Sequence, residues 1–164
     1  MPKANRARST LRRPALEARR NLDANNGNVT IQGVVTGGTA TIEGTGKIEF
    51  GASSAANVIF AANADGILRI DQTFAGTVAG MATGDGIDLA NFLFANNPTI
   101  LSVTGTGAVG STTNVTVNDG SLSMTLELLN QYANQFAVDT SAYSLTADNN
   151  TPNQGTQFQL AAPH

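Results

Sequence analysis

Several residue types that carry enzyme chemistry are missing from this sequence or nearly so. The 164 residues contain no cysteine and no tryptophan, and the only histidine is His164. Without cysteine the chain forms no disulfide, has no thiolate nucleophile and offers no Cys-based zinc or iron–sulfur site. A single histidine at position 164 also argues against Ser–His or Cys–His nucleophilic catalysis and against the usual zinc sites.

Charged and aromatic residues are scarce as well. Charged residues make up 13% of the chain, against about 25% in an average soluble domain, and aromatic residues make up 5%. Glycine occurs 17 times, and Asn, Thr, Ala and Ser fill much of the rest. This composition favours short strands and tight turns over helices, which are rich in Leu, Glu, Lys and Arg. No apolar run approaches the roughly 18 residues of a membrane helix, so we expect no membrane span.

The charges that are present are unevenly distributed. Seven of the nine basic residues lie within residues 1–20, whereas residues 21–164 contain two basic and 11 acidic residues, a net charge of −9. We interpret residues 1–24 as a basic arm that is disordered or weakly helical and serves as a solubilising tail. A nucleic-acid-binding arm is the alternative, but the acidic body repels phosphate, so we expect no nucleic-acid partner.

A spacing of about ten residues dominates the middle of the chain. Apolar residues recur at this step, the last of them one residue late: Ile48, Val58, Leu68, Val78 and Leu89. Turn clusters rich in Gly, Asn, Asp and Ser separate them. One short strand and one tight turn per step is typical of a β-solenoid or β-roll, in which two steps form a coil of about 20 residues. An antiparallel β-sandwich also places a strand roughly every 8–12 residues and is the alternative fold.

The pattern changes in the C-terminal part of the chain. Asn118–Gly120 separates two alternating runs, Thr113–Val117 and Ser121–Leu128, which is a strong hairpin signal. We expect this hairpin to cap the last coil, because an exposed terminal rung would be a sticky edge. The fold predicted is therefore all-β, a solenoid closed by a C-terminal hairpin. It has three parts: the arm at 1–24, a β-solenoid-like domain with its hairpin cap at 25–146, and a polar tail at 147–164 with one short strand at Gln157–Leu160.

Paired carboxylates are the one enzymatic signal that the composition leaves open. Polysaccharide lyases and hydrolases on β-helices combine Asp or Glu with Arg or Lys, and the candidates here are Glu43, Lys47, Glu49, Arg69 and Asp71. Alternation along the strands places Glu43, Lys47 and Glu49 on one side, which predicts a solvated, salt-bridged face. Tryptophan platforms for sugars are also lacking. We therefore expect no enzyme activity and no catalytic residue.

A second motif concerns metal binding. The segment Gly84–Leu89, GDGIDL, is close to half of the calcium-binding nonapeptide G-G-x-G-x-D-x-U-x. Asp85 and Asp88 carry oxygens that suit Ca²⁺, but successive copies are needed to complete such a site and only one is present. We predict that both aspartates accept backbone N–H bonds in the turn and at the strand exit. No cofactor is expected, and calcium at Asp85 and Asp88 is the alternative.

The same stretch resembles a segment of large bacterial exoproteins. Phe74–Gly80 and Gly84–Leu89 are similar to F-x-G-x-I-x-G-F-x-x-G-D-x-I-D-L, which recurs in large secreted and surface-attached repeat proteins. They are also similar to the G-D-K-I-D-L that flanks the calcium β-roll of RTX-type exoproteins. Gly66–Asp71 matches the G-T-L-x-L-D that normally precedes this segment. In addition, Leu16–Ala24 resembles the LEPR…L-D-A motif of very large bacterial surface proteins, with Ala18 in place of the proline.

The resemblance implies a non-catalytic, adhesin-like module that serves as a scaffold or terminal cap. It implies a location outside the bacterial cell or on its surface, and export by type I secretion. Host or matrix surface glycans and proteins are the expected partners. The exposed ends of a solenoid also predict end-to-end self-association into fibres if the C-terminal hairpin does not cap its rung. The alternative function is a carbohydrate-binding or carbohydrate-active β-helix protein.

Overall fold

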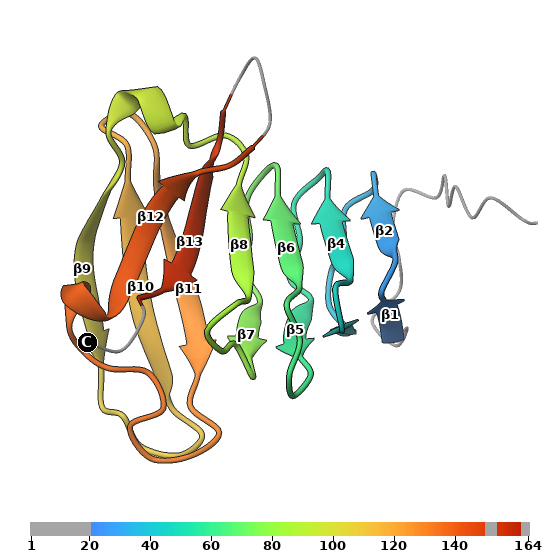
Figure 1. Ribbon diagram of the computed structural model, residues 1–164, viewed down its shortest axis with the longest axis horizontal. Coiled ribbons are helices and arrows are strands. Elements are labelled where there is room, and N and C mark those ends of the chain that lie inside the picture. Colours follow the sequence, from blue (N-terminus) through green and yellow to red (C-terminus); the bar gives the residue numbers. More distant parts are fainter. Residues whose placement is uncertain (1–20, 150–153, 162–164) are drawn as a thin grey trace, which may run out of the picture.

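The computed structural model describes residues 21–149 and 154–161, and within them almost every element is a strand (Figure 1). The predicted β-solenoid is confirmed: four parallel coils stack in a row, and antiparallel strands close the stack at the C-terminal end. Most of the basic arm and of the LEPR-like motif lies outside the described residues. In the described part of the chain, no helix is long and apolar enough to cross a membrane.

Each coil contributes one strand to each of two sheets. The first sheet takes β1 (Asn21–Asn25), β3 (Thr39–Glu43), β5 (Asn57–Phe60) and β7 (Thr77–Ala79). The second takes β2 (Asn28–Ile31), β4 (Lys47–Phe50), β6 (Ile67–Ile70) and β8 (Gly86–Leu89). Strands of successive coils pair in parallel, and partner residues lie 18 to 20 positions apart along the chain. This matches the expected coil of about 20 residues.

A third side of the coils is held together by single bridges. Val35 bridges to Ser54, and Ser54 bridges to Phe74, again in parallel. All three residues are buried. The coils are therefore closed loops around a common interior, with two regular sides and one irregular side.

The core consists of rows that run from coil to coil. Because side chains alternate across a strand, every second residue of each strand points inward, and the parallel register stacks these residues on one another. The innermost row of the second sheet joins Ile48, Leu68 and Ile87, which are all 0% exposed. Burying a side chain of this size contributes about 1.5–3 kcal/mol relative to leaving it exposed. The ten-residue spacing of the sequence corresponds to inward positions that belong alternately to the two sheets.

One corner of the coils requires residues without a side chain. Register aligns Gly27, Gly46 and Gly66 just before the strands of the second sheet. A Cβ built on Gly46 would lie 1.9 Å from the carbonyl oxygen of Ala24, and one on Gly66 would lie 2.3 Å from Cγ2 of Ile42. Both distances are far too short, so glycine at this corner lets successive coils approach each other.

The first coil begins earlier than the predicted domain boundary at residue 25. Strand β1 starts at Asn21, and Ala24 is buried opposite Ile42. The Asn26–Gly27 turn signal lies inside this coil, between β1 and β2. A tight turn within a coil and a turn between domains use the same residue types, so a turn of this kind does not by itself mark a domain boundary.

The cap is built from two antiparallel units, one for each sheet. The predicted hairpin is confirmed as β10 (Thr112–Asn118) and β11 (Ser123–Leu129), with β9 (Thr99–Gly105) on its other side. Strand β11 pairs with β7 and extends the first sheet to seven strands. The hairpin thus covers only one side of the last coil.

The second sheet is closed by strands near the C-terminus. Strand β13 (Thr156–Leu160) contains the short strand expected at Gln157–Leu160, and it lies between β8 and β12 (Tyr143–Ala147) in a six-stranded sheet. Phe158 is 0% exposed and stacks on Tyr143, with ring centroids 5.4 Å apart. Two short 3₁₀ helices, η1 (Phe94–Asn96) and η2 (Thr140–Ala142), lie in the connections.

Candidate functional site: a charged row on the second sheet

A row of polar side chains crosses the outer face of the second sheet. Glu49 of β4 pairs with Arg69 of β6, Arg69 pairs with Asp88 of β8, and Gln157 of β13 lies opposite Asp88. Their neighbours along each strand, such as Ile48 and Leu68, fill the core. Period-two alternation therefore turns these residues outward, and the register of the paired strands aligns them.

Arg69 is the centre of the row. Its Nε lies 2.8 Å from Oδ1 of Asp71 and 3.9 Å from Oε2 of Glu49, and its Nη1 lies 3.1 Å from Oδ2 of Asp88. Burial by itself would lower the pKa of Arg69, but the charges of Asp88, Asp71 and Glu49 outweigh it and raise that pKa. One guanidinium thus forms ion pairs with three carboxylates of the protein.

Asp88 differs from the other carboxylates in its burial. Its side chain is 6% exposed, against 24% for Glu49 and 26% for Asp71. Burial, together with the nearby carboxyl of Asp148, raises the pKa of Asp88 to about 6. Arg69 and Lys47 act in the opposite direction. Asp88 consequently gains and loses its proton closer to neutral pH than an ordinary aspartate does.

The structure brings together most of the carboxylates and cations that the sequence singled out. Arg69 forms ion pairs with Glu49 and Asp71, as the interpretation of a salt-bridged face predicts, and Lys47 lies in the same sheet on β4. The placement of Glu43 beside Glu49 was wrong. Glu43 ends β3 in the first sheet, where it accepts a hydrogen bond from Nδ2 of Asn25 at 2.8 Å. Alternation does not carry across the turn that separates the two strands.

Asp85 has the role of a turn residue, as predicted. It occupies the register position that glycine holds in the preceding coils, and it is 0% exposed. Its Oδ1 accepts a hydrogen bond from the N–H of Gly66 at 3.0 Å, and its Oδ2 accepts one from the N–H of Ala82 at 2.9 Å. Burial raises the pKa of Asp85, while these two N–H groups act in the opposite direction.

The same prediction was wrong for Asp88, which pairs with Arg69 instead of a backbone N–H. Asp85 binds backbone at the corner of the coil, whereas Asp88 lies in the outer row, so the two carboxyls do not face one shared position. Among the described residues, no group of three or more Asp, Glu or His side chains is arranged to hold a metal ion.

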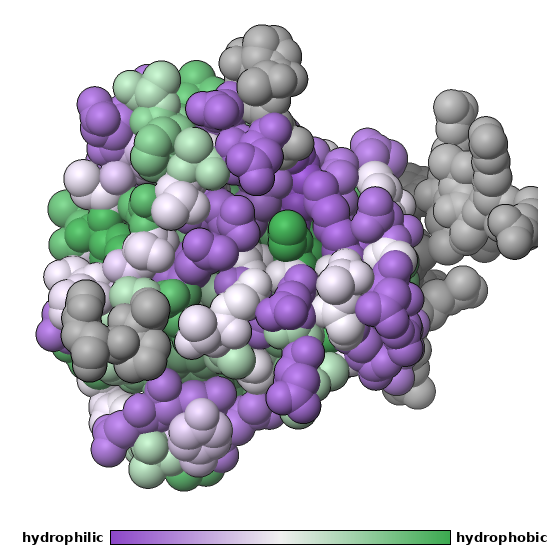
Figure 2. Space-filling view, in the orientation of Figure 1, coloured by the Kyte–Doolittle hydropathy of each residue, from purple (hydrophilic) through white to green (hydrophobic). Residues whose placement is uncertain are grey.

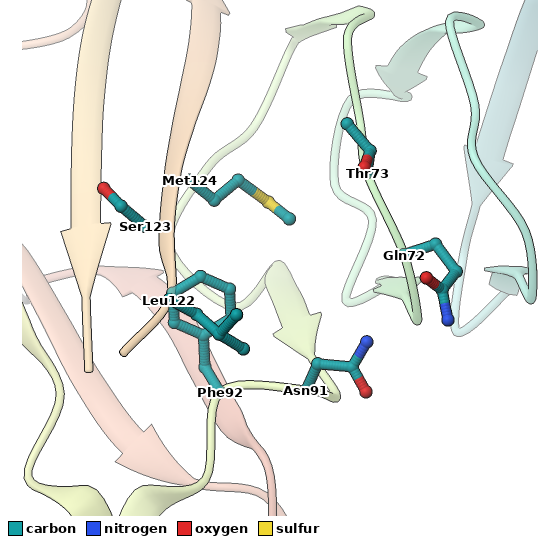
Figure 3. A pocket seen from close by; sticks show the side chains of 7 residues that line it. All are labelled: Gln72, Thr73, Asn91, Phe92, Leu122, Ser123 and Met124. Carbon is teal, nitrogen blue, oxygen red and sulfur yellow. The ribbon is translucent and has the colours of Figure 1, made fainter. Parts of the chain in front are cut away.

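A shallow pocket lies where the cap meets the last coils (Figure 3). Its volume is about 190 Å³. It is lined by Gln72, Thr73, Asn91, Phe92, Leu122, Ser123 and Met124. Met124, Leu122 and Phe92 lie on the cap side of the opening, and Gln72 and Thr73 face them across it. The lining combines apolar surface with side-chain amides and hydroxyls and includes no ionisable group.

Exposed apolar surface is concentrated in the cap. Large hydrophobic side chains that are exposed there are Leu93, Phe94, Leu101, Val109, Leu122, Tyr132 and Val138, against Val34 in the described coils. In Figure 2 the coils are mainly covered by hydrophilic residues, whereas hydrophobic residues gather over the cap. A scan of protein-family models, a search of curated proteins and a search of solved structures each found no match.

Asp88 of the charged row and the neighbouring Asp148 were missed by sequence reasoning. Asp88 was considered only with Asp85, although Arg69 and Asp88 are 19 residues apart, which is one coil. The coil period, applied to charged residues as well as apolar ones, would have paired them. Asp148 has no comparable signal, because it follows β12 in the antiparallel cap, where no period relates it to the coils.

Proposed function

We propose that this chain is a non-catalytic structural or adhesive module of a bacterial protein that acts outside the cell or on its surface. The observation that carries this proposal is the difference between the two ends of the stack. At the last coil both sheets continue into cap strands, β11 and β13, whereas β1 and β2 are the outermost strands of the first coil in the described chain.

Within residues 21–149 and 154–161, the first coil has a less buried core and strand edges that pair with no further strand. Val29 belongs to the row of Ile48, Leu68 and Ile87, but it is only partly buried, whereas the other three are fully buried. A further coil placed against β1 and β2 would complete this row and satisfy the free backbone groups of the edge. The open end thus suits end-to-end association, and the cap ends the stack.

The chemistry of the surface supports a module without catalysis. The carboxylates of the charged row form ion pairs with Arg69. The residues that line the pocket carry amides, hydroxyls and apolar side chains, none of them ionisable. The exposed apolar side chains of the cap offer a contact surface for host or matrix glycans and proteins. The resemblance of Phe74–Leu89 to bacterial exoproteins supports the extracellular or cell-surface location and type I export.

End-to-end association is tested by light scattering after size exclusion over a range of protein concentrations. Since only the β1/β2 end is open in the described chain, we expect a dimer of two open ends whose fraction rises with concentration, and we expect the Val29→Lys variant to be monomeric, because a buried lysine cannot be accommodated at the junction. The Leu101→Lys variant, which adds the same charge on β9 of the cap, is the matched control and leaves the dimer intact. Monomer at every concentration contradicts end-to-end association.

The absence of catalysis is tested separately on soluble polysaccharides. We expect no release of reducing ends or unsaturated products from any of them. Turnover that disappears in the Glu49→Gln variant and persists in the Glu43→Gln variant contradicts the proposal and assigns the charged row as an active site.

A carbohydrate-binding protein is the second candidate, and the pocket favours it. Asn91 and Gln72 provide amides on opposite sides of the pocket, and Leu122 and Met124 provide apolar surface, a combination that suits sugar hydroxyls and an apolar sugar face. Oligosaccharides of several classes are added, and the melting temperature is measured. A shift that is lost in the Asn91→Ala variant and retained in the Asn57→Ala variant supports this candidate, and no shift with any oligosaccharide argues against it.

A further inference from the structure

Two buried carboxyls meet where the cap joins the last coil. Asp88 is 4% exposed and lies on β8, and Asp148 is 5% exposed and directly follows β12. Strand β13 connects their surroundings: Gln157 lies opposite Asp88, and the N–H of Asp148 donates to the carbonyl oxygen of Gly155 at 3.1 Å. The Asp148 side chain lies over Gly155, since a Cβ built on that glycine would be 2.9 Å from Oδ2 of Asp148, and its carboxyl is within hydrogen-bonding reach of the carboxyl of Asp88.

The hydrogen bonds of Asp88 account for only one of its oxygens. Oδ2 accepts from Nη1 of Arg69 at 3.1 Å. Oδ1 is buried, and no donor reaches it within the described chain. An ionised carboxylate has acceptors and no donor, so a hydrogen bond between Asp88 and Asp148 forms only when one of them carries a proton.

We propose that Asp88 and Asp148 bind a single proton between them, and that this shared proton fastens the β12–β13 part of the cap to the last coil. When the proton is present, a carboxylic acid donates to a carboxylate across the junction. When it leaves, two carboxylates remain side by side in a buried position and repel each other. The junction is then a proton-binding site that holds the cap more tightly in acid than at neutral pH.

The surroundings of the pair contain charges of both signs. Arg69 on β6 and Lys47 on β4 favour the ionised form of Asp88, and β13 contributes Gln157, which is uncharged. Asp71 and Glu49 reach the pair only through Arg69, which they partly neutralise. The two cations do not overcome burial and the neighbouring carboxyl, since the pKa of Asp88 is raised to about 6.

The direction of the pH dependence follows from this raised pKa. The closed junction binds its proton with a pKa of about 6, whereas an opened junction returns Asp88 to its ordinary value near 4. Between these values the closed form holds more protons than the open form. The stabilisation is therefore complete below about pH 4 and is lost as the pH rises through about 6.

Hydrogen exchange of the β13 amides measures the opening of this junction directly. Protection factors, which correct for the intrinsic pH dependence of exchange, are determined by NMR at pH 5 and pH 7. Opening that releases the proton becomes about ten-fold more favourable over this interval, so we expect a corresponding loss of protection in β13. Amides of β4, two coils away, change much less.

Two variants separate the shared proton from general acid effects. Asp88→Asn keeps an oxygen for Arg69 and supplies a permanent N–H donor for Asp148, so its β13 protection at pH 7 equals that of the unmodified chain at pH 5. Asp71→Asn removes a carboxylate that also binds Arg69 but lies outside the junction, and it retains the pH dependence. A ¹³C titration of the side-chain carboxyls of the unmodified chain assigns the proton without any variant.

The proposal is overturned if the titration finds the pKa of Asp88 below about 5. It is equally overturned if β13 protection is unchanged between pH 5 and pH 7, or if Asp71→Asn abolishes the dependence as Asp88→Asn does. These results concern the junction alone, and they leave the structural or adhesive role untouched.

Discussion

The strands of the coils and the strands of the cap pair in opposite directions. In the coils every strand pairs in parallel with the strand one coil away, so the inward residues of successive coils align into apolar rows such as Ile48, Leu68 and Ile87. In the cap the strands pair antiparallel and each pair is unique. Repetition gives the coils a uniform interior and a mostly polar surface. The cap is free of this constraint and carries most of the exposed apolar side chains.

This difference separates two tasks within one chain. The coils extend the stack, and the inward side chains of each coil pack against those of the next. The cap ends the stack and presents a distinct surface. Substitutions in the coils should therefore act through packing between coils, whereas substitutions in the cap should act through individual hydrogen bonds.

The largest effect is expected for Leu68→Ala in the third coil. Leu68 is 0% exposed and lies between Ile48 and Ile87 in the central row. The cavity cannot collapse, because the coils on both sides fix its walls, so we expect a loss of about 3–5 kcal/mol in the free energy of unfolding. Urea denaturation measures this loss. Ile67→Ala, on the outer side of the same strand, should cost much less, and an equal cost would contradict the assigned inward face.

The next effect concerns a polar group in the cap. Asn130 is 0% exposed; its Nδ2 donates to the carbonyl oxygen of Ser111 and to Oγ1 of Thr113, and its Oδ1 accepts from the N–H of Phe136 at 3.0 Å. Asn130→Ala leaves these buried groups unpaired and should cost about 2–4 kcal/mol. Gln131→Ala, at the exposed neighbouring position, is the control. A cost below about 1 kcal/mol for Asn130→Ala would show that the cap does not depend on this network.

A smaller effect is expected where a coil departs from the repeat. Asp85→Ala leaves the N–H groups of Gly66 and Ala82 without their acceptor and should cost about 1–3 kcal/mol, measured by thermal unfolding. Asp85→Asn retains an acceptor oxygen for one of them and should cost less. Adding Ca²⁺ or EGTA should leave the melting temperature of the unmodified chain unchanged; stabilisation by Ca²⁺ that Asp85→Asn removes would contradict the turn role.

The smallest effect belongs to the outer face of the coils. Glu49→Gln removes a partner that lies 3.9 Å from Nε of Arg69 and is 24% exposed. We expect a change of at most about 0.5 kcal/mol, since exposed ion pairs contribute little. Asp71→Asn, at 2.8 Å from the same atom, should cost more. A larger loss for Glu49→Gln than for Asp71→Asn would mean that Glu49 has a role beyond this ion pair.

The repeating part of the fold could be predicted from the sequence, because one spacing governs strands, turns and core alike. The spacing predicts that Ile48 and Leu68 occupy equivalent inward positions. The Asn118–Gly120 turn predicts a hairpin from its residue types alone. The junction between Asp88 and Asp148 could not be found in this way. It depends on β13 crossing to β8, and a pairing of segments so far apart leaves no local pattern.

The sheet and the face on which Glu43 lies could not be predicted from alternation. Alternation holds only within a strand, and the turn at residues 44–46 sends the chain to the other sheet. A charged residue near a turn can therefore be assigned to a face only when the turn geometry is known.

The parallel register of the coils is the central claim, and a disulfide tests it most directly because the chain has no cysteine of its own. Lys47 and Ile67 are register partners on the outer face of β4 and β6, so cysteines at both positions should be oxidised completely within the monomer under mild conditions. A pair at Lys47 and Arg69, displaced along the strand, should stay reduced. Efficient closure of the displaced pair, with none for the aligned pair, would contradict the stacked coils and favour the antiparallel sandwich.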